Sequence, residues 1–220
     1  MTSLNPKHFV ERWSNPDLRP SLTGSIIDES GCKCAQGDVL SQCGYTDDEL
    51  RAMGQDEADA ETARLLGISQ NHAILLRNVN DSEDGCPQDV LDTSSGGIER
   101  LLGPNAKLVL AFWRYLGTMT KEQFDSVQRK ARSMVRNASE NKAWFAALTA
   151  AWNTAVTMSR DTEWYKAMNA LKIDGPVTVK LMVEYASLEL IVLDGIKSFY
   201  FLPILGLDDP RNQLAEFMVD

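Results

Sequence analysis

Soft metal ligands are scarce in this chain of 220 residues, which has four cysteines and two histidines. So few cysteines in a chain of this length do not form the framework of a disulfide-stabilised scaffold. Long apolar runs are also missing, because the longest stretch without charge, residues 143–159, contains three threonines and an asparagine. That stretch is too short and too polar for a membrane span of about 20 residues. The first ten residues have no apolar run typical of a signal peptide.

Positive charge is in deficit as well, with 22 Lys and Arg against 31 Asp and Glu and a net charge of −9. A general nucleic-acid binder needs a basic surface that displaces counterions, so the composition argues against that class. Apolar residues are plentiful, at 44% of the chain, with five Trp and seven Phe. This composition excludes a disordered chain and predicts a soluble acidic protein with a buried core.

Local signals predict helices throughout. Two capping boxes stand at Thr46–Glu49 and Thr120–Gln123, where a Thr hydroxyl and an acidic or amide side chain satisfy free amides at a helix start. After the second box, apolar residues recur every three or four positions between residues 124 and 138, as on an amphipathic helix. Asp209 before Pro210 is typical of a further helix start. Because no strand alternation of useful length is present, we predict a mostly α fold, an irregular multi-helix bundle.

The middle of the chain repeats alanine at every fourth position, beside a parallel stripe of large residues. An alanine stripe lets another helix approach closely, so we predict a buried central helix here. A further helix is expected to start near Thr162 and to end at Gly175-Pro176. Residues 199–205 form an apolar run broken by Pro203, which we expect to pack as an irregular segment. The two stripes are Ala143, Ala147, Ala151 and Ala155, and Trp144, Leu148, Trp152 and Val156.

Prolines 6, 16 and 20 interrupt the first 30 residues, which we predict to be an extended N-terminal arm with apolar anchors. Residues 31–220 are predicted to form a single α-helical domain. A small-residue loop and Pro104 mark residues 93–104 as the place of a sub-boundary, if the domain has one.

Several segments together resemble an uncharacterised group of bacterial and bacteriophage proteins that have an alanine-rich central helix with repeated Ala-Ala-Trp units. The resemblance covers most of residues 20–215, and it implies a phage or bacterial origin. Because no targeting signal is recognised, we expect the protein in the cytoplasm of a bacterial host cell or in a virion. The resemblance implies no activity. This chain departs from the group in its middle, where the repeat is shortened and Ala150-Ala151-Trp152 is its remnant. The segments are 32–40, 63–69, 72–77, 79–82, 109–113, 199–203 and 209–210.

The cysteines and one histidine are weak candidates for a metal site, namely Cys32, Cys34, Cys43, His72 and Cys86. Their spacing lacks the paired knuckles of a structural zinc site, so we predict no metal and no cofactor. The thiols are expected to be free, with a disulfide or redox use as the alternative. No local signature supports a Cys34–His72 nucleophile pair. Residues 80–85 resemble the start of a calcium loop, but position 12 is Leu91 instead of a bidentate Glu.

Two features favour binding. Trp113, Trp144 and Trp152 could line an aromatic pocket for a small molecule. Arg129, Arg132 and Arg136 recur at helical spacing and form a basic stripe in an acidic chain. The stripe either is a solvated face or contacts an acidic partner surface or a phosphate backbone.

These observations predict a non-enzymatic helical protein that acts through binding or assembly, as a phage accessory or virion component. Its expected partner is another protein or a second copy of itself, with no general nucleic-acid binding and no membrane. Enzymatic activity is left open, although no catalytic constellation favours it. The alternative is a protein that binds or modifies a small molecule in an aromatic pocket near Trp113, Trp144 and Trp152.

Overall fold

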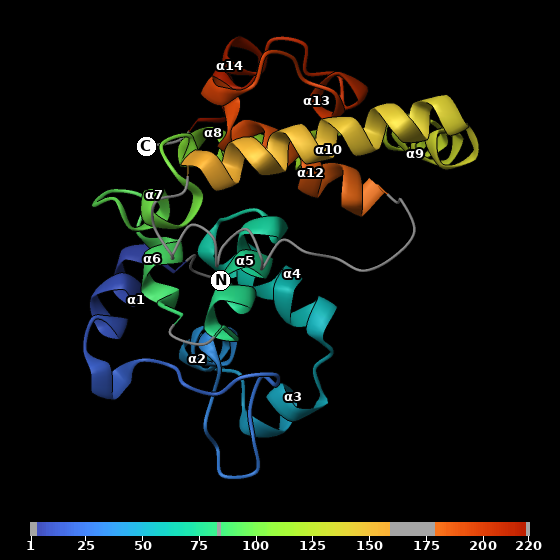
Figure 1. The fold of residues 1–220 in the computed structure, drawn as a ribbon. Helices are drawn as coiled ribbons and strands as arrows, with labels where there is room; N and C mark the ends of the chain where they lie inside the picture. Colours follow the sequence, from blue (N-terminus) through green and yellow to red (C-terminus); the bar gives the residue numbers. More distant parts are fainter. Residues whose placement is uncertain (1–3, 83–84, 159–178, 219–220) are drawn as a thin grey trace. The chain divides into compact units, whose positions relative to one another are not determined.

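The computed structural model describes residues 4–82, 85–158 and 179–218, apart from the side chains of 134–136, 138–141, 151–152, 155–158 and 179–181. The described chain is mostly helical, which confirms the predicted fold class (Figure 1). Its β pairing is limited to an isolated antiparallel bridge between Ile27 and Lys33. Within these ranges, no helix is both long enough and apolar enough to cross a membrane.

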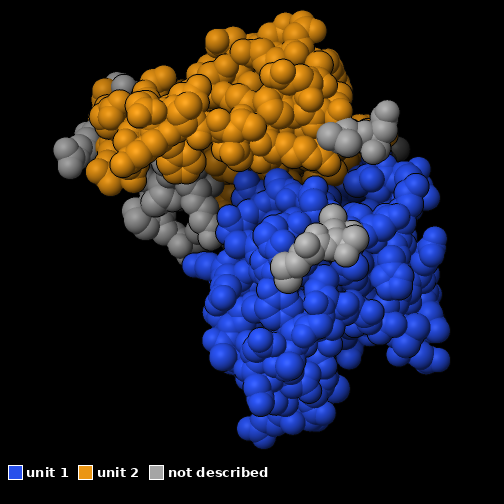
Figure 2. Space-filling view, turned by 180° about the vertical axis from the view of Figure 1, so that it is seen from behind, with its two compact units in different colours: residues 1–101, 220 blue, residues 102–219 orange. Residues whose placement is uncertain are grey.

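The chain divides into two compact units, residues 1–101 and 102–219, at a point within the stretch 93–104 (Figure 2). Residues 1–30, expected to form an arm, belong to unit 1. Its helices are α1 (Pro6–Trp13), α2 (Ala35–Gln42), α3 (Asp47–Ala52), α4 (Gln55–Leu66), α5 (Gln70–Asn80) and α6 (Pro87–Leu91), with a 3-10 turn, η1 (Pro16–Leu18). Helix α7 (Gly97–Leu102) ends at the division.

Helix α1 begins where the sequence has Pro6, because a proline at the first helical position lacks only an N–H that has no partner in the helix. Asn5 caps this end by accepting a hydrogen bond from the Lys7 amide. Phe9 and Trp13 are fully buried, and α1 packs against α6. These two aromatic side chains therefore fix the N-terminal segment in unit 1 through apolar burial.

The core of unit 1 lies where α2, α3 and α4 meet the bridge segment around residues 26–27. Gly37 on α2 makes this approach close, since a Cβ atom there would lie 2.3 Å from the carbonyl oxygen of Ile26. The predicted capping box at Thr46–Glu49 is confirmed at the start of α3. The cluster consists of Ile26, Ile27, Cys34, Leu40, Leu50, Ala58 and Leu65.

Unit 2 contains α8 (Ala106–Thr118), α9 (Lys121–Arg136), α10 (Ala138–Met158), α12 (Val179–Ile191), α13 (Phe201–Ile204) and α14 (Pro210–Gln213). It also has two 3-10 turns, η2 (Leu193–Gly195) and η3 (Ala215–Phe217). The capping box at Thr120–Gln123 starts α9, and Pro210 is the first residue of α14, both as predicted. The expected helix between Thr162 and Gly175 lies outside the described residues.

Helix α10 forms, but the prediction that it is a buried central helix is wrong at its described positions. Ala143 is exposed, Ala147 and Leu148 are half-buried, and Trp144 is buried. The helix packs against α9 and α12. A run without charge therefore did not indicate full burial, because an exposed methyl group costs little in water.

The apolar run near the C-terminus folds into one helical turn, α13, instead of an irregular segment. Its free N-terminal amides are held by a side chain from α12. The buried carboxylate of Glu189 accepts hydrogen bonds from the amides of Tyr200, Phe201 and Leu202 at 2.6–3.0 Å. A buried acceptor from elsewhere in the chain thus supplies the cap that the local sequence lacks.

Candidate functional site

The four cysteines, all of them in the described part of unit 1, form no disulfide. Cys34 is buried and caps α2, because its Sγ accepts a hydrogen bond from the Gly37 amide at 3.4 Å. Burial raises the pKa of the Cys34 thiol, which disfavours the reactive thiolate. Cys32 is exposed, while Cys43 and Cys86 are half-buried. The structure assigns Cys34 a helix-capping role that sequence spacing did not reveal.

His72 is also a packing residue. It lies on α5 with only 2% of its surface exposed, and its Nε2 is 2.7 Å from the carbonyl oxygen of Val90 on α6. Throughout the described ranges, no three His, Cys, Asp or Glu side chains come close enough together to hold a metal ion. The weak metal candidates named from the sequence are therefore not brought together there.

Polar side chains at the C-terminal end of α5 connect separate segments of unit 1. Asn80 is buried, where its Oδ1 accepts from the Ala35 amide at 3.1 Å and its Nδ2 donates to the Leu22 carbonyl at 2.7 Å. The neighbouring Asp81 accepts from the Gly24 amide. These bonds connect three separate segments of chain, so this end of α5 acts as a structural tie.

A buried polar cluster joins α2, α4 and α5, and sequence analysis missed it. The Gln36 amide donates to Asp59 at 2.7 Å, and Asp59 pairs with Arg77 at 3.1 Å. Gln55 donates to the Gln36 carbonyl oxygen at 2.9 Å. Because Asp59 is almost fully buried, its charge depends on these partners. The cluster stabilises the packing of three helices.

The tryptophans named as pocket residues differ in their surroundings. Trp113 on α8 is 4% exposed, and its Nε1 donates to Ser187 on α12 at 2.8 Å. Trp144 on α10 is 8% exposed and packs edge-on against Tyr185 of α12, with ring centroids 5.5 Å apart. The Trp144 Nε1 is buried without a hydrogen-bond acceptor among the described residues. The side chain of Trp152 lies outside the described part of the chain.

The basic stripe lies on α9, whose inner side contributes Val127 and Ala131 to the core. Arg129 and Arg132 are exposed, and neither makes an ion pair with a residue that the structure describes. The Arg136 side chain lies outside the described residues. We call Arg129, Lys130 and Arg132 of α9, with Lys142 of α10, the basic face; all four side chains are exposed.

Large apolar side chains are exposed on the same two helices. Phe124 of α9 is 44% exposed and Phe145 of α10 is 56% exposed. Phe145 lies three positions after Lys142, so the two residues are neighbours on the helix surface. Phe124 lies three positions before Val127, on the side of α9 that contributes to the core, so Phe145 is the exposed aromatic ring beside a residue of the basic face. Exposed aromatic rings are enriched at protein-binding interfaces.

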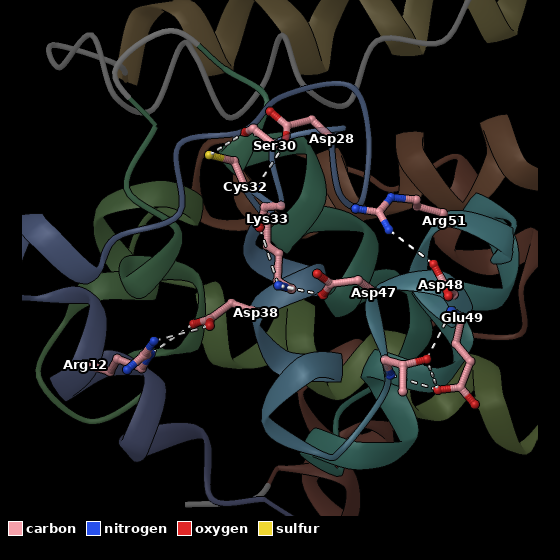
Figure 3. Close-up of polar contacts among 12 residues, drawn as sticks. Arg12, Asp28, Ser30, Cys32, Lys33, Asp38, Asp47, Asp48, Glu49 and Arg51 are labelled. Atoms are coloured by element: carbon pink, nitrogen blue, oxygen red, sulfur yellow. Dashed lines mark hydrogen bonds and ion pairs between the residues drawn. The ribbon is translucent and has the colours of Figure 1, made fainter.

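Arginines in unit 1 contrast with this arrangement. Five of its six arginines form ion pairs, two of which appear in Figure 3, and the sixth, Arg19, donates to the Trp13 carbonyl. Arg12, for example, holds Asp38 through two contacts of 3.1 and 3.4 Å. The ion pairs are Arg12–Asp38, Arg51–Asp48, Arg64–Glu61, Arg77–Asp59 and Arg100–Asp89.

Comparisons with known proteins add no relative: no protein-family model, no curated protein and no solved structure matches this chain. The resemblance to a bacterial and bacteriophage group therefore stays a prediction. The basic face of unit 2 is the candidate functional site that the geometry favours, because Arg129 and Arg132 are exposed and form no ion pair with any residue that the structure describes.

Proposed function

We propose that this protein is a non-enzymatic binding or assembly protein that uses the basic face of α9 and α10 to hold an acidic macromolecular partner. The observation that carries the proposal is the exposure of Arg129 and Arg132 without an ion pair among the described residues. An exposed guanidinium group is available for bidentate contacts with carboxylates.

Exposed Phe145, three positions after Lys142, supports the proposal, since an aromatic ring supplies apolar area that charges alone do not. The fold provides a rigid base, because Val127 and Ala131 bury the opposite side of α9. The resemblance to bacterial and phage proteins favours a role as a phage accessory or virion component, in the host cytoplasm or the virion.

A binding measurement with poly-L-glutamate, a soluble model of an acidic protein surface, tests the proposal. We expect wild-type protein to bind it at low salt and the double variant R129E/R132E to lose about tenfold or more in affinity. The matched control is K107E/K197E, which makes the same charge change at two exposed lysines of unit 2. Equal losses in the two variants, or no binding by the wild type, would contradict the proposal.

A second candidate function is small-molecule binding beside Trp144, and one observation favours it. The buried Nε1 of Trp144 has no acceptor among the described residues, and such a donor gains free energy when a ligand oxygen accepts its hydrogen bond. Native mass spectrometry of the purified protein tests this candidate. A stoichiometric small-molecule adduct that is lost in W144F supports it, and a spectrum of the bare chain alone removes it.

A further inference from the structure

The charge of the chain is divided unequally between the two units. Residues 1–101 contain 8 Lys and Arg against 18 Asp and Glu, a net charge of −10. Residues 102–220 contain 14 Lys and Arg against 13 Asp and Glu, a net charge of +1. Residues 1–101 therefore account for the negative charge of the chain. Residues 102–220, which include the basic face, are close to neutral.

Acidic residues of unit 1 occupy the first turns of two helices that are consecutive in the sequence, α3 and α4. Three acidic residues begin α3 and two begin α4, and all five are exposed. Exposed Glu29 lies in the loop before α2, between Asp28 and Ser30, which Figure 3 labels. We call this set the acidic face: Glu29, Asp47, Asp48, Glu49, Asp56 and Glu57.

Part of the acidic face is already engaged within unit 1. Asp47 pairs with Lys33 at 3.0 Å, Asp48 pairs with Arg51 at 3.3 Å, and Glu49 accepts from Thr46 (Figure 3). Glu29, Asp56 and Glu57 make no ion pair with any residue in the described ranges. The carboxylates of Glu29, Asp56 and Glu57 are therefore available for ion pairs with a partner. The guanidinium groups of Arg129 and Arg132 in unit 2 are available in the same way.

We propose that the partner of the basic face is a second copy of this chain, whose acidic face on α3 and α4 receives Arg129 and Arg132. This inference rests on the proposed function and names its partner. The charges are complementary in sign, and their exposed positions let each guanidinium group reach a carboxylate without desolvating an unpaired charge.

The two faces are different surfaces, so the contact is heterologous. When the basic face of one copy binds the acidic face of a second copy, the first copy still has a free acidic face and the second a free basic face. Association therefore continues beyond a dimer unless the rotation closes a ring. Phe145, beside Lys142, gives the contact an apolar component, while its electrostatic part weakens as salt rises.

Sedimentation velocity over a range of protein concentrations tests this inference. At an ionic strength of about 0.02 M we expect the wild type to sediment as oligomers, and at about 0.5 M as a monomer, because salt screens exposed charges. R129E/R132E and D56K/E57K are each expected to stay monomeric at low salt. K107E/K197E is the control, which keeps oligomers. D56N/E57Q repeats the test with smaller changes at the start of α4, should the reversal disturb that helix.

Mixing the two reversed variants gives the sharpest result. In a mixture, the acidic face of R129E/R132E meets the basic face of D56K/E57K, and the two reversed faces are also opposite in charge. We expect the mixture to form oligomers at low salt although each variant alone stays monomeric. A mixture that stays monomeric, or a wild type that is monomeric at every concentration, overturns the inference.

The outcome separates this inference from the proposed function. If the wild type binds poly-L-glutamate through Arg129 and Arg132 but does not self-associate, the binding function stands and the second copy is excluded as partner. If a DNA duplex binds the wild type more tightly than poly-L-glutamate and disperses the oligomers, a phosphate backbone is the partner and the inference is overturned.

Discussion

The arginines of unit 1 and those on α9 of unit 2 have opposite surroundings. In unit 1 five of the six guanidinium groups pair with carboxylates of the same unit, and one pair, Arg77–Asp59, is joined to a buried amide network. Arg211 of unit 2 also pairs with a carboxylate, that of Asp194. In unit 2, Arg129 and Arg132 point into solvent from a helix whose other side is buried. Ion pairs in the first unit stabilise packing, whereas Arg129 and Arg132 on α9 pair with no carboxylate that the structure describes. Exposed charges of that kind are available to a binding partner.

Breaking the buried pair gives the largest effect that we expect. Asp59→Ala leaves Arg77 and the Gln36 amide without their partner, so the free energy of unfolding of unit 1 falls by about 3 kcal/mol. Asp48→Ala is the matched change at an exposed pair, where we expect about 0.5 kcal/mol or less. Urea denaturation followed by far-UV circular dichroism measures both values. Similar losses in the two variants would contradict the distinction.

Two glutamates extend the comparison to pH. Arg64 and Tyr45 donate to Glu61 in unit 1 and lower its pKa from 4.5 to about 2. A carboxyl whose pKa falls on folding stabilises the protein above pH 4.5, and that stability is lost as the pH falls toward about 2. Glu61→Gln removes about 1 kcal/mol of this acid-sensitive stability, since solvent screens part of the pair.

Glu189 in unit 2 has the opposite sign. Burial raises its pKa, although three backbone amides donate to the carboxylate. The folded state therefore holds a proton more tightly than the unfolded state, and this contribution to stability is lost as the pH rises through the folded pKa. Glu189→Gln keeps the shape of the side chain but cannot titrate. We expect it to remove the decrease in unfolding free energy with rising pH, even if the Gln side chain lowers stability at every pH.

Unfolding free energies measured across about pH 2 to 8 test the two glutamates together, because each single variant removes one slope. We expect Glu61→Gln to flatten the acidic limb and Glu189→Gln to flatten the decline toward neutral pH. Curves that keep the wild-type slopes in both variants would show that these carboxyls titrate alike in the folded and unfolded chain.

Local features of the sequence were predictable because their partners lie within one helical turn. Both capping boxes, the proline start of α14 and the amphipathic spacing of α9 depend on residues three or four positions apart. The basic stripe followed from the same periodicity. These elements could be predicted without knowledge of the tertiary fold.

Features that depend on distant partners could not be predicted. Asp59 meets Gln36, 23 residues earlier, and Glu189 caps a turn that starts 11 residues later. The side of α10 that faces water depends on where α9 and α12 pack, which alanine spacing alone does not determine. The tertiary fold sets these contacts.

Arg129 and Arg132 are expected to serve binding and to contribute almost nothing to folding. Measuring the free energy of unfolding and the poly-L-glutamate affinity on one preparation of R129E/R132E tests this claim directly. We predict an unfolding free energy within about 0.5 kcal/mol of the wild type, because exposed unpaired charges stabilise little, together with a loss of about tenfold or more in affinity. Wild-type affinity, or a loss of several kcal/mol in stability, would contradict the claim.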